Sequence, residues 1–148
     1  MANATKKSSR SIAYRLLGLF LSASAAMGQA PQTEPAVKRV VGLEYPWFAR
    51  MGGIQGTVEL AATISQEGTV IGISVVSGPE PLATPAKDSL SKWRFTACTS
   101  PSAECKTKLV FLFVLAGTCK ISHCPTEFEV DLPDKVRVKS KIFDSPIY

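Results

Sequence analysis

The sequence has little of what enzymes use for chemistry. It contains a single His, His123, and it lacks a GxSxG elbow, a phosphate-binding loop and a dinucleotide fingerprint. The one Gly-Ile-Ser run, Gly72 to Ser74, lies inside an extended stretch rather than at a turn between a strand and a helix. Any Ser/His or Cys/His pair would depend on His123, and its neighbour Cys124 cannot be a nucleophile when it is held in a disulfide. We therefore expect no enzyme, no catalytic residue and no cofactor.

Long hydrophobic runs and a basic face are also missing. The longest apolar run, Leu16–Ala26, has 11 residues, whereas a spanning helix needs about 20. The net charge is +5, but Lys6, Lys7, Arg10 and Arg15 all precede residue 31 and no acid accompanies them. The rest of the chain has 17 − 4 = 13 basic residues against 12 acidic ones. This balance argues against nucleic acid as a partner.

The first 30 residues have the pattern of a secretory signal. A basic, Ser-rich start precedes the apolar run, and the small residues Gly28 and Ala30 follow it before Pro31. An uncleaved anchor helix beginning near Ile12 would place Arg15 in lipid. No Cys follows the apolar run, which argues against a lipoprotein. We expect residues 1–30 to be removed, leaving an exported chain with no stable membrane span.

Export determines how the four cysteines are interpreted. Cys98, Cys105, Cys119 and Cys124 lack the paired CxxC spacing of a zinc ribbon. An even number in an oxidising compartment indicates disulfides, for which three pairings exist. The local pairing, Cys98 with Cys105 and Cys119 with Cys124, is preferred because each bond closes a small loop. The alternative is a metal site that uses His123, and we expect no metal.

Hydrophobic spacing gives the order helix, hairpin, helix, strand, hairpin, in a chain of 148 residues that suits one domain. A polar lead over 31–44, with two prolines, is expected to be flexible. The expected elements are a helix over 45–51, strands over 56–65 and 69–77, a helix over 82–93, with Thr84 as an alternative N-cap, a strand over 107–116, and hairpin arms over 127–132 and 135–140.

Two of these strands carry further information. The strand over 69–77 is apolar on both faces, which predicts a central strand or one covered on one face by helices. The two arms of the last hairpin flank Pro133-Asp134 and alternate charged with apolar residues. Acidic residues on the first arm face basic residues on the second, which stabilises an antiparallel pair.

An ordered set of residues resembles one known family. The set consists of Tyr45, Pro46, Ala49, Arg50, Gly53, Gly56, Gly68, Gly78, Trp93, Arg94 and Phe95. Together, over 45–116, it is similar to the C-terminal domain of the TonB energy transducers. The resemblance implies an α+β fold, a small antiparallel sheet packed against two helices, in which these residues mainly hold helices to the sheet. It divides the chain into a domain over 45–117 and an extra hairpin and tail over 118–148.

The resemblance also implies a partner. Members of this family act in the periplasm and pair a sheet edge with the TonB box, a short extended segment of an outer-membrane transporter. By position, the receiving edge is formed by Thr107, Lys108, Leu109, Val110, Phe111, Leu112, Phe113, Val114 and Leu115. Leu43 and Glu44 are expected near the plug of the transporter.

Several features depart from a full transducer. Such a protein has a membrane anchor and a long Pro-rich span, whereas the lead here is 14 residues and reaches at most ~50 Å. Ala97-Cys98 replaces the Pro that usually follows the Trp-Arg-Phe motif, and the tail has no counterpart in the family. Its hairpin could cover the receiving edge.

Two hypotheses follow. The first is a periplasmic module that binds a transporter or its TonB box, which an open edge over 107–115 would favour. The second is a structural or assembly protein that uses the fold for self-pairing as a homodimer or for scaffolding of the envelope, which an edge sealed by the tail would favour. An inner-membrane anchored protein facing the periplasm is the alternative if residues 1–30 are retained.

Overall fold

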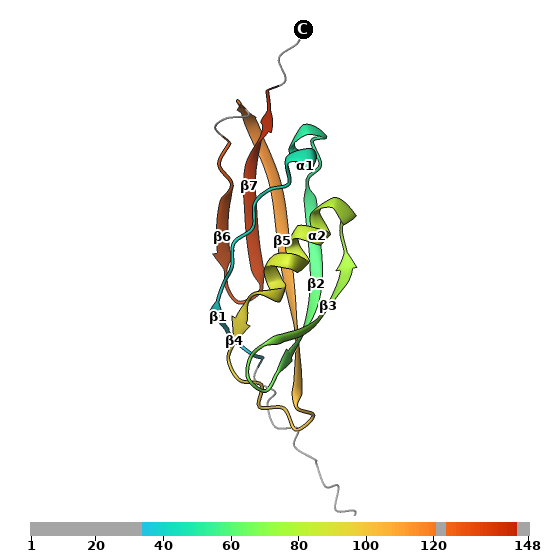
Figure 1. The fold of residues 1–148 in the computed structure, drawn as a ribbon, viewed down its shortest axis with the longest axis vertical. Coiled ribbons are helices and arrows are strands. Elements are labelled where there is room, and N and C mark those ends of the chain that lie inside the picture. The colour runs from blue at the N-terminus through green and yellow to red at the C-terminus, as the bar shows by residue number, and fades with distance from the viewer. Residues whose placement is uncertain (1–33, 121–123, 145–148) are drawn as a thin grey trace, which may run out of the picture. The chain divides into compact units, whose positions relative to one another are not determined.

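The computed structural model describes residues 34–120 and 124–144 (Figure 1). The predicted signal over 1–30 and the candidate metal ligand His123 lie outside these residues. Neither described helix is long and apolar enough to cross a membrane. The elements are β1 (Val37–Arg39), α1 (Trp47–Met51), β2 (Gly56–Ser65), β3 (Val70–Ser77), α2 (Glu80–Ser91), β4 (Arg94–Phe95), β5 (Glu104–Cys119), β6 (Glu127–Asp131) and β7 (Lys135–Phe143).

The main sheet has five strands in the order β3-β2-β5-β7-β6. The resemblance implied an antiparallel sheet with an extra C-terminal hairpin, but the hairpin joins the sheet and β7 runs parallel to β5, so the sheet is mixed. The parallel pair arises because the chain leaves β5, passes the position of β7 to form β6, and turns back at Leu132–Asp134. Both helices lie over one face of this sheet (Figure 1), and the α+β fold class is confirmed.

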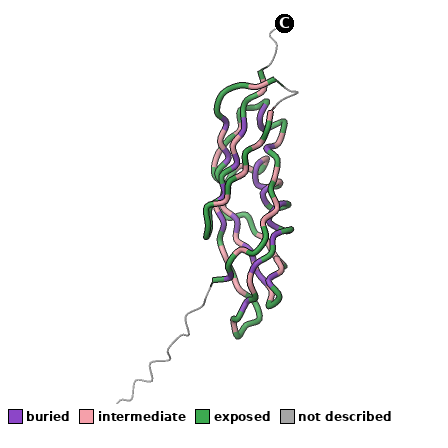
Figure 2. The backbone as a smooth tube through the Cα atoms, turned by 90° about the vertical axis from the view of Figure 1, so that its left-hand side faces the viewer, coloured by how far each residue is buried: buried purple, intermediate pink, exposed green. Residues whose placement is uncertain are grey.

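The core lies between the sheet and the helices (Figure 2). In β2, Val58, Leu60, Ala62 and Ile64 are buried in strict alternation, as the period-two pattern predicts. From the other layer α2 contributes Leu82, Ala83, Ala86 and Leu90. This helix begins at Glu80, before the predicted Leu82 and the alternative cap Thr84, since Pro81 falls in the first turn, where a missing N–H leaves no bond unmade.

Gly68 shows why one motif glycine is required. It has φ +83°, and its carbonyl oxygen accepts a 2.8 Å bond from the N–H of Phe95. A Cβ at this position would collide with the carbonyl oxygen of Phe95. Gly68 therefore allows the β2–β3 turn to lie directly against β4.

The lead is ordered from Glu34 on, and the prediction of a flexible segment is wrong there. Val37–Arg39 forms β1, which pairs antiparallel with β4. Val40, Val41 and Leu43 pack against the core. The prediction went wrong because the two prolines and the charges of the lead are typical of a flexible segment. Burial of its apolar side chains outweighs the entropy lost when the segment is ordered.

Of the two alternatives predicted for the strand over 69–77, the central position is wrong, whereas cover by a helix on one face holds in part. This segment is the edge strand β3, with β2 on one side only. The helix α2 covers part of one face, and Ile71, Val75 and Val76 are exposed. The apolar residues therefore do not mark a central strand.

The C-terminal hairpin forms as predicted and belongs to the same sheet as the rest. Glu127 faces Lys139, Glu129 faces Arg137 and Asp131 faces Lys135. The Oε2 atom of Glu129 forms ion pairs with Nη1 of Arg137 at 3.2 Å and with Nζ of Lys139 at 3.5 Å. Because β5 runs to Cys119, the boundary expected at 117 falls inside a strand.

The inner face of β7 supports a stability prediction. Val138 is fully buried, and Val76 on β3 is about half exposed. We expect Val138→Ala to lower the free energy of unfolding by about 2 kcal/mol, because it removes two buried methyl groups and leaves a cavity. The matched change Val76→Ala should cost about 0.5 kcal/mol or less. Urea unfolding measures both, and equal values would contradict a core that includes β7.

Candidate partner-binding site

The predicted receiving edge is closed. From Val110 to Leu115, β5 pairs with β7 on one side. On its other side it pairs with β2 as far as Phe113. The N–H of Val110 donates to the carbonyl oxygen of Asp134 at 2.8 Å. The prediction that Thr107–Leu115 forms an edge is therefore wrong from Val110 onward, because the tail supplies β7 as the missing neighbour.

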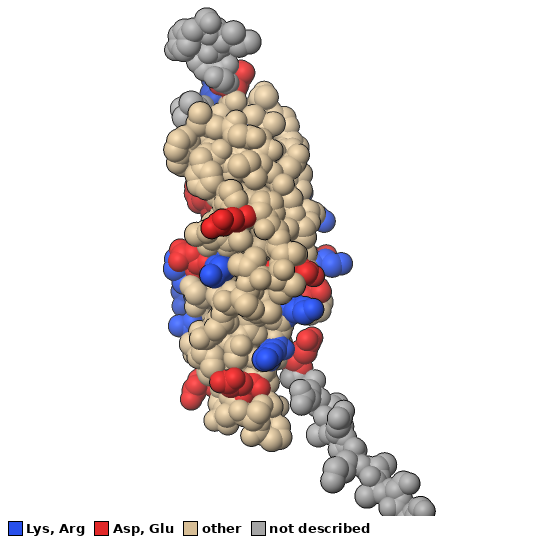
Figure 3. Space-filling view, turned by 90° about the vertical axis from the view of Figure 1, so that its right-hand side faces the viewer, with Lys and Arg blue, Asp and Glu red and all other residues tan. Residues whose placement is uncertain are grey.

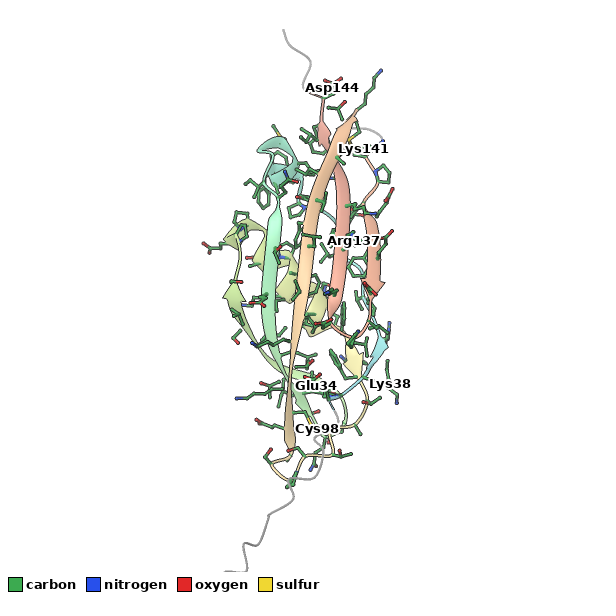
Figure 4. All side chains as sticks on the ribbon, turned by 180° about the vertical axis from the view of Figure 1, so that it is seen from behind. Glu34, Lys38, Cys98, Arg137, Lys141 and Asp144 are labelled. Carbon is green, nitrogen blue, oxygen red and sulfur yellow. A yellow bond between two sulfur atoms is a disulfide. The ribbon has the colours of Figure 1, made fainter. Side chains whose placement is uncertain are left out.

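The side chains of the predicted edge also divide between two environments. Leu109, Phe111, Phe113 and Leu115 are buried in the core and cannot reach a partner. The alternate residues, from Lys108 to Val114, lie on the face of the sheet that the helices leave open. Figure 4 shows this face from behind, with Arg137 of β7 upon it. The second set is accessible, and from Val110 to Phe113 the main chain beside it is already paired on both sides.

Arg50 ties the segment before β6 to α1. It is almost fully buried, and its Nη1 donates to the carbonyl oxygen of Cys124 at 2.8 Å. Its Nη2 donates to Oγ1 of Thr126 at 2.6 Å, and its guanidinium lies 5.3 Å from the centroid of the Phe143 ring. A cation buried this deeply needs such partners, since a lost partner would leave its charge desolvated. Arg50 therefore holds the hairpin in place.

Both disulfides join the cysteines that the sequence preference paired. Cys98–Cys105 closes the loop between β4 and β5, and Cys119–Cys124 closes the loop between β5 and β6. Each loop is short, so the bonds restrict the ends of β5 locally. Among the described residues no group of three His, Cys, Asp or Glu side chains is placed to hold a metal ion.

The aromatic motif residues hold the layers together. Nε1 of Trp93 donates to the carbonyl oxygen of Val41 at 3.0 Å, and its ring packs 6.0 Å from that of Phe111. The hydroxyl of Tyr45 donates to the carbonyl oxygen of Ile54 at 2.6 Å, and its ring meets Phe113 edge-on. Arg94 is exposed, and its Nη1 donates to the carbonyl oxygen of Trp93 at 2.8 Å. Trp93 and Tyr45 therefore join the lead and the segment after α1 to the sheet, whereas Arg94 makes no such contact.

An open apolar surface lies where Glu44 was expected to face a partner. Glu44 lines a groove of about 580 Å³ between α1 and α2, together with Pro46, Phe48, Glu80, Pro81, Thr84, Pro85 and Asp88. Beside it Trp47 and Met51 are 65% and 63% exposed. Leu43, the other predicted residue, is half-buried against the core and does not line the groove. The sequence analysis missed Trp47, Phe48 and Met51, because a five-residue helix is too short to show a period.

Comparison with known proteins identifies the class. The family model for the Gram-negative bacterial TonB protein C-terminal matches residues 41–115. This is half of the chain, so the protein belongs to the TonB C-terminal family. The hairpin β6–β7 lies outside the matched residues.

The solved structures that are similar include the solution NMR structure of the Pseudomonas aeruginosa TonB C-terminal domain. It is 21% identical, with a TM-score of 0.44, and the match covers 55% of this chain and 87% of that one. A comparison with curated proteins finds no match.

The buried Tyr45 hydroxyl gives a pH prediction. Burial raises the pKa of Tyr45 from 10.0 to about 12, and the charge of Arg50 opposes part of this rise. The unfolded chain releases this proton first, so the stability linked to Tyr45 is complete below pH 10 and falls as the pH rises toward 12. We expect the free energy of unfolding of wild type to fall more steeply over this range than that of Tyr45→Phe. Parallel slopes in urea unfolding would contradict it.

Proposed function

We propose that the chain is a non-enzymatic TonB-type binding module of the cell envelope, which contacts an outer-membrane transporter through the groove between α1 and α2. The observation that carries the proposal is the exposed cluster of Trp47, Phe48 and Met51 beside this groove. Contiguous exposed apolar side chains in a folded chain indicate a protein interaction site. Trp is also the residue type most enriched where interfaces bind tightly.

The groove favours a partner segment of a particular chemistry. Its walls are apolar and stiff, since three prolines and Phe48 contribute to them, and its rim carries Glu44, Glu80 and Asp88. Asp88 is paired with Lys92 at 3.2 Å, but within the described chain neither Glu44 nor Glu80 forms an ion pair. A segment with an apolar side chain flanked by Lys or Arg would complement both features.

Family membership supports the partner class, because TonB C-terminal domains interact with outer-membrane transporters. Pairing of a TonB box with Thr107–Leu115 is not part of this proposal, since β7 occupies that side of β5. We also propose that residues 1–30 direct export to the periplasm, which leaves residues 31–148 as the working module.

The second candidate is an assembly protein that uses the fold without transduction. The sealed β5 edge is the observation that favours it, because the main-chain groups the family would offer are already bonded within the chain. The two candidates differ in where they place the partner, which a site-specific experiment can resolve.

We expect a benzophenone-bearing amino acid at Trp47 to cross-link to an outer-membrane transporter when the full chain is expressed in its own cells. The same group at Leu132, which is exposed in the β6–β7 turn, should give no such adduct. Glu80→Lys should reduce the Trp47 adduct about tenfold, since it replaces attraction of a basic segment by repulsion.

The matched charge control is Glu67→Lys, which lies in the β2–β3 turn and should leave the adduct unchanged. Adducts are identified by mass spectrometry of the cross-linked band. Adducts from Leu132 alone, or none from Trp47, would contradict the proposed surface. An adduct of Trp47 with a second copy of this chain alone would favour the assembly protein.

A further inference from the structure

Helix α2 presents two rows of side chains to the groove between α1 and α2. Residues four apart lie on the same face of a helix, and here they form one polar row and one proline row. The polar row is Glu80, Thr84 and Asp88, and the proline row is Pro81 and Pro85. Proline rings are rigid and apolar, so this wall has a fixed shape that a partner must match.

Trp47 adds a hydrogen-bond donor beside the groove. Its ring lies edge-on to that of Phe48, with 6.3 Å between the centroids and 86° between the planes. Nε1 of Trp93 donates to the carbonyl oxygen of Val41, but no hydrogen bond among the described residues uses Nε1 of Trp47, which is exposed. An indole N–H can only donate. The side chain of Trp47 therefore suits a partner that offers a carbonyl oxygen.

Charge is confined to one part of this surface. Figure 3 shows the side of the molecule that faces right in Figure 1, and at the height of α1 it presents almost no charged side chain. Acidic side chains appear lower, at the height of α2. Asp88 is paired with Lys92 at 3.2 Å. The other acids of the groove, Glu44 and Glu80, form no ion pair within the described chain, so they attract a basic group to the first turn of α2.

The dimensions of the groove limit the conformation of a bound segment. From Glu80 to Asp88 it is about 12 Å long, at 1.5 Å per helical residue. This length holds about two turns of an α-helix, which are not stable alone in water. It holds about four residues of a polyproline II helix, which is more than one full turn.

Main-chain pairing is not available in the groove. Most of its lining residues belong to α1 and α2, so there is no free strand edge for an extended segment to join. A polyproline II segment needs no such edge, because its backbone has no internal hydrogen bonds and stays solvated. Of the three regular conformations, it is the one that fits both the length and the chemistry of the walls.

We propose that the groove between α1 and α2 binds a Pro-rich segment in the polyproline II conformation, with a Lys or Arg at one end. Proline rings of the segment pack on Phe48, Pro81 and Pro85. A carbonyl oxygen of the segment accepts from Nε1 of Trp47, and the basic residue lies beside Glu80. Such a segment is largely ordered before it binds, which keeps the entropy cost low. The inference rests on the proposed function, since it names the kind of segment that the partner carries.

The experiment titrates the full chain, purified in the form that cells produce, with a blocked peptide of sequence Lys-Pro-Pro-Leu-Pro-Pro. The chain has two Trp residues and hence two indole N–H signals by NMR, which Trp47→Phe assigns. The signal of Trp47 should shift and saturate, whereas that of Trp93 should not move, because Trp93 is fully buried and already bonded. Trp47→Phe keeps an aromatic ring without the donor and should weaken binding about fivefold, measured at the amide of Phe48.

Matched controls separate conformation from charge. The peptide Lys-Gly-Ala-Leu-Gly-Ala keeps the charge without the polyproline II preference, and Glu-Pro-Pro-Leu-Pro-Pro keeps the preference with the opposite charge. Each should bind about tenfold more weakly. Glu80→Lys should weaken the first peptide about tenfold, and Glu67→Lys in the β2–β3 turn should leave its affinity unchanged. Equal affinity for the Gly/Ala peptide, an equal shift of Trp93, or no saturable shift of Trp47 would overturn the inference.

Two results separate this inference from the proposed function. A transporter adduct at Trp47 without saturable binding of the Pro-rich peptide would overturn the inference and leave the transporter surface in place. Saturable binding of the peptide without a transporter adduct would support the assigned ligand of the groove and contradict the transporter as the partner that carries it.

Discussion

The pairing of β7 with β5 is the contact on which the rest of this structure depends. It places Val136 and Val138 in the core, beside Phe111 and Phe113. Burying each valine contributes roughly 1.5–3 kcal/mol before the entropy of ordering is counted. Two further contacts hold the same hairpin. Arg50 binds the segment before β6, and the Cys119–Cys124 disulfide joins that segment to the end of β5. Removal of the hairpin would therefore expose the core, and β7 is a structural strand rather than a movable cover.

This closed strand changes where the module can meet a partner. The edge that the family resemblance implied has its hydrogen bonds made within the chain. The surfaces left open are the groove between α1 and α2, with acids on its rim, and the uncharged edge of β3. The groove suits a basic and apolar segment. A partner can bind at either surface without breaking a native contact, whereas binding at the β5 edge would have to displace β7.

The sequence predicted the local features well. The bounds of β2, the facing charges of β6 and β7 and the two short disulfide loops all depend on neighbours close in the chain. The misses have non-local causes. Val37 pairs with Phe95 and β5 pairs in parallel with β7, and no periodicity within either segment encodes its distant neighbour. The groove was missed because its walls come from Pro46 and Pro85, which meet only when α1 packs beside α2.

Hydrogen exchange along β5 tests the central claim most directly. From Val110 to Leu115 the strand has neighbours on both sides, whereas from Lys106 to Leu109 it pairs with β2 alone. If the hairpin is part of the core, every amide over 110–115 should exchange slowly. Over 106–109, alternate amides should exchange fast, which makes the strand its own control. Fast exchange at alternate residues throughout 106–115 would show that β7 leaves β5 readily, and would contradict the closed edge.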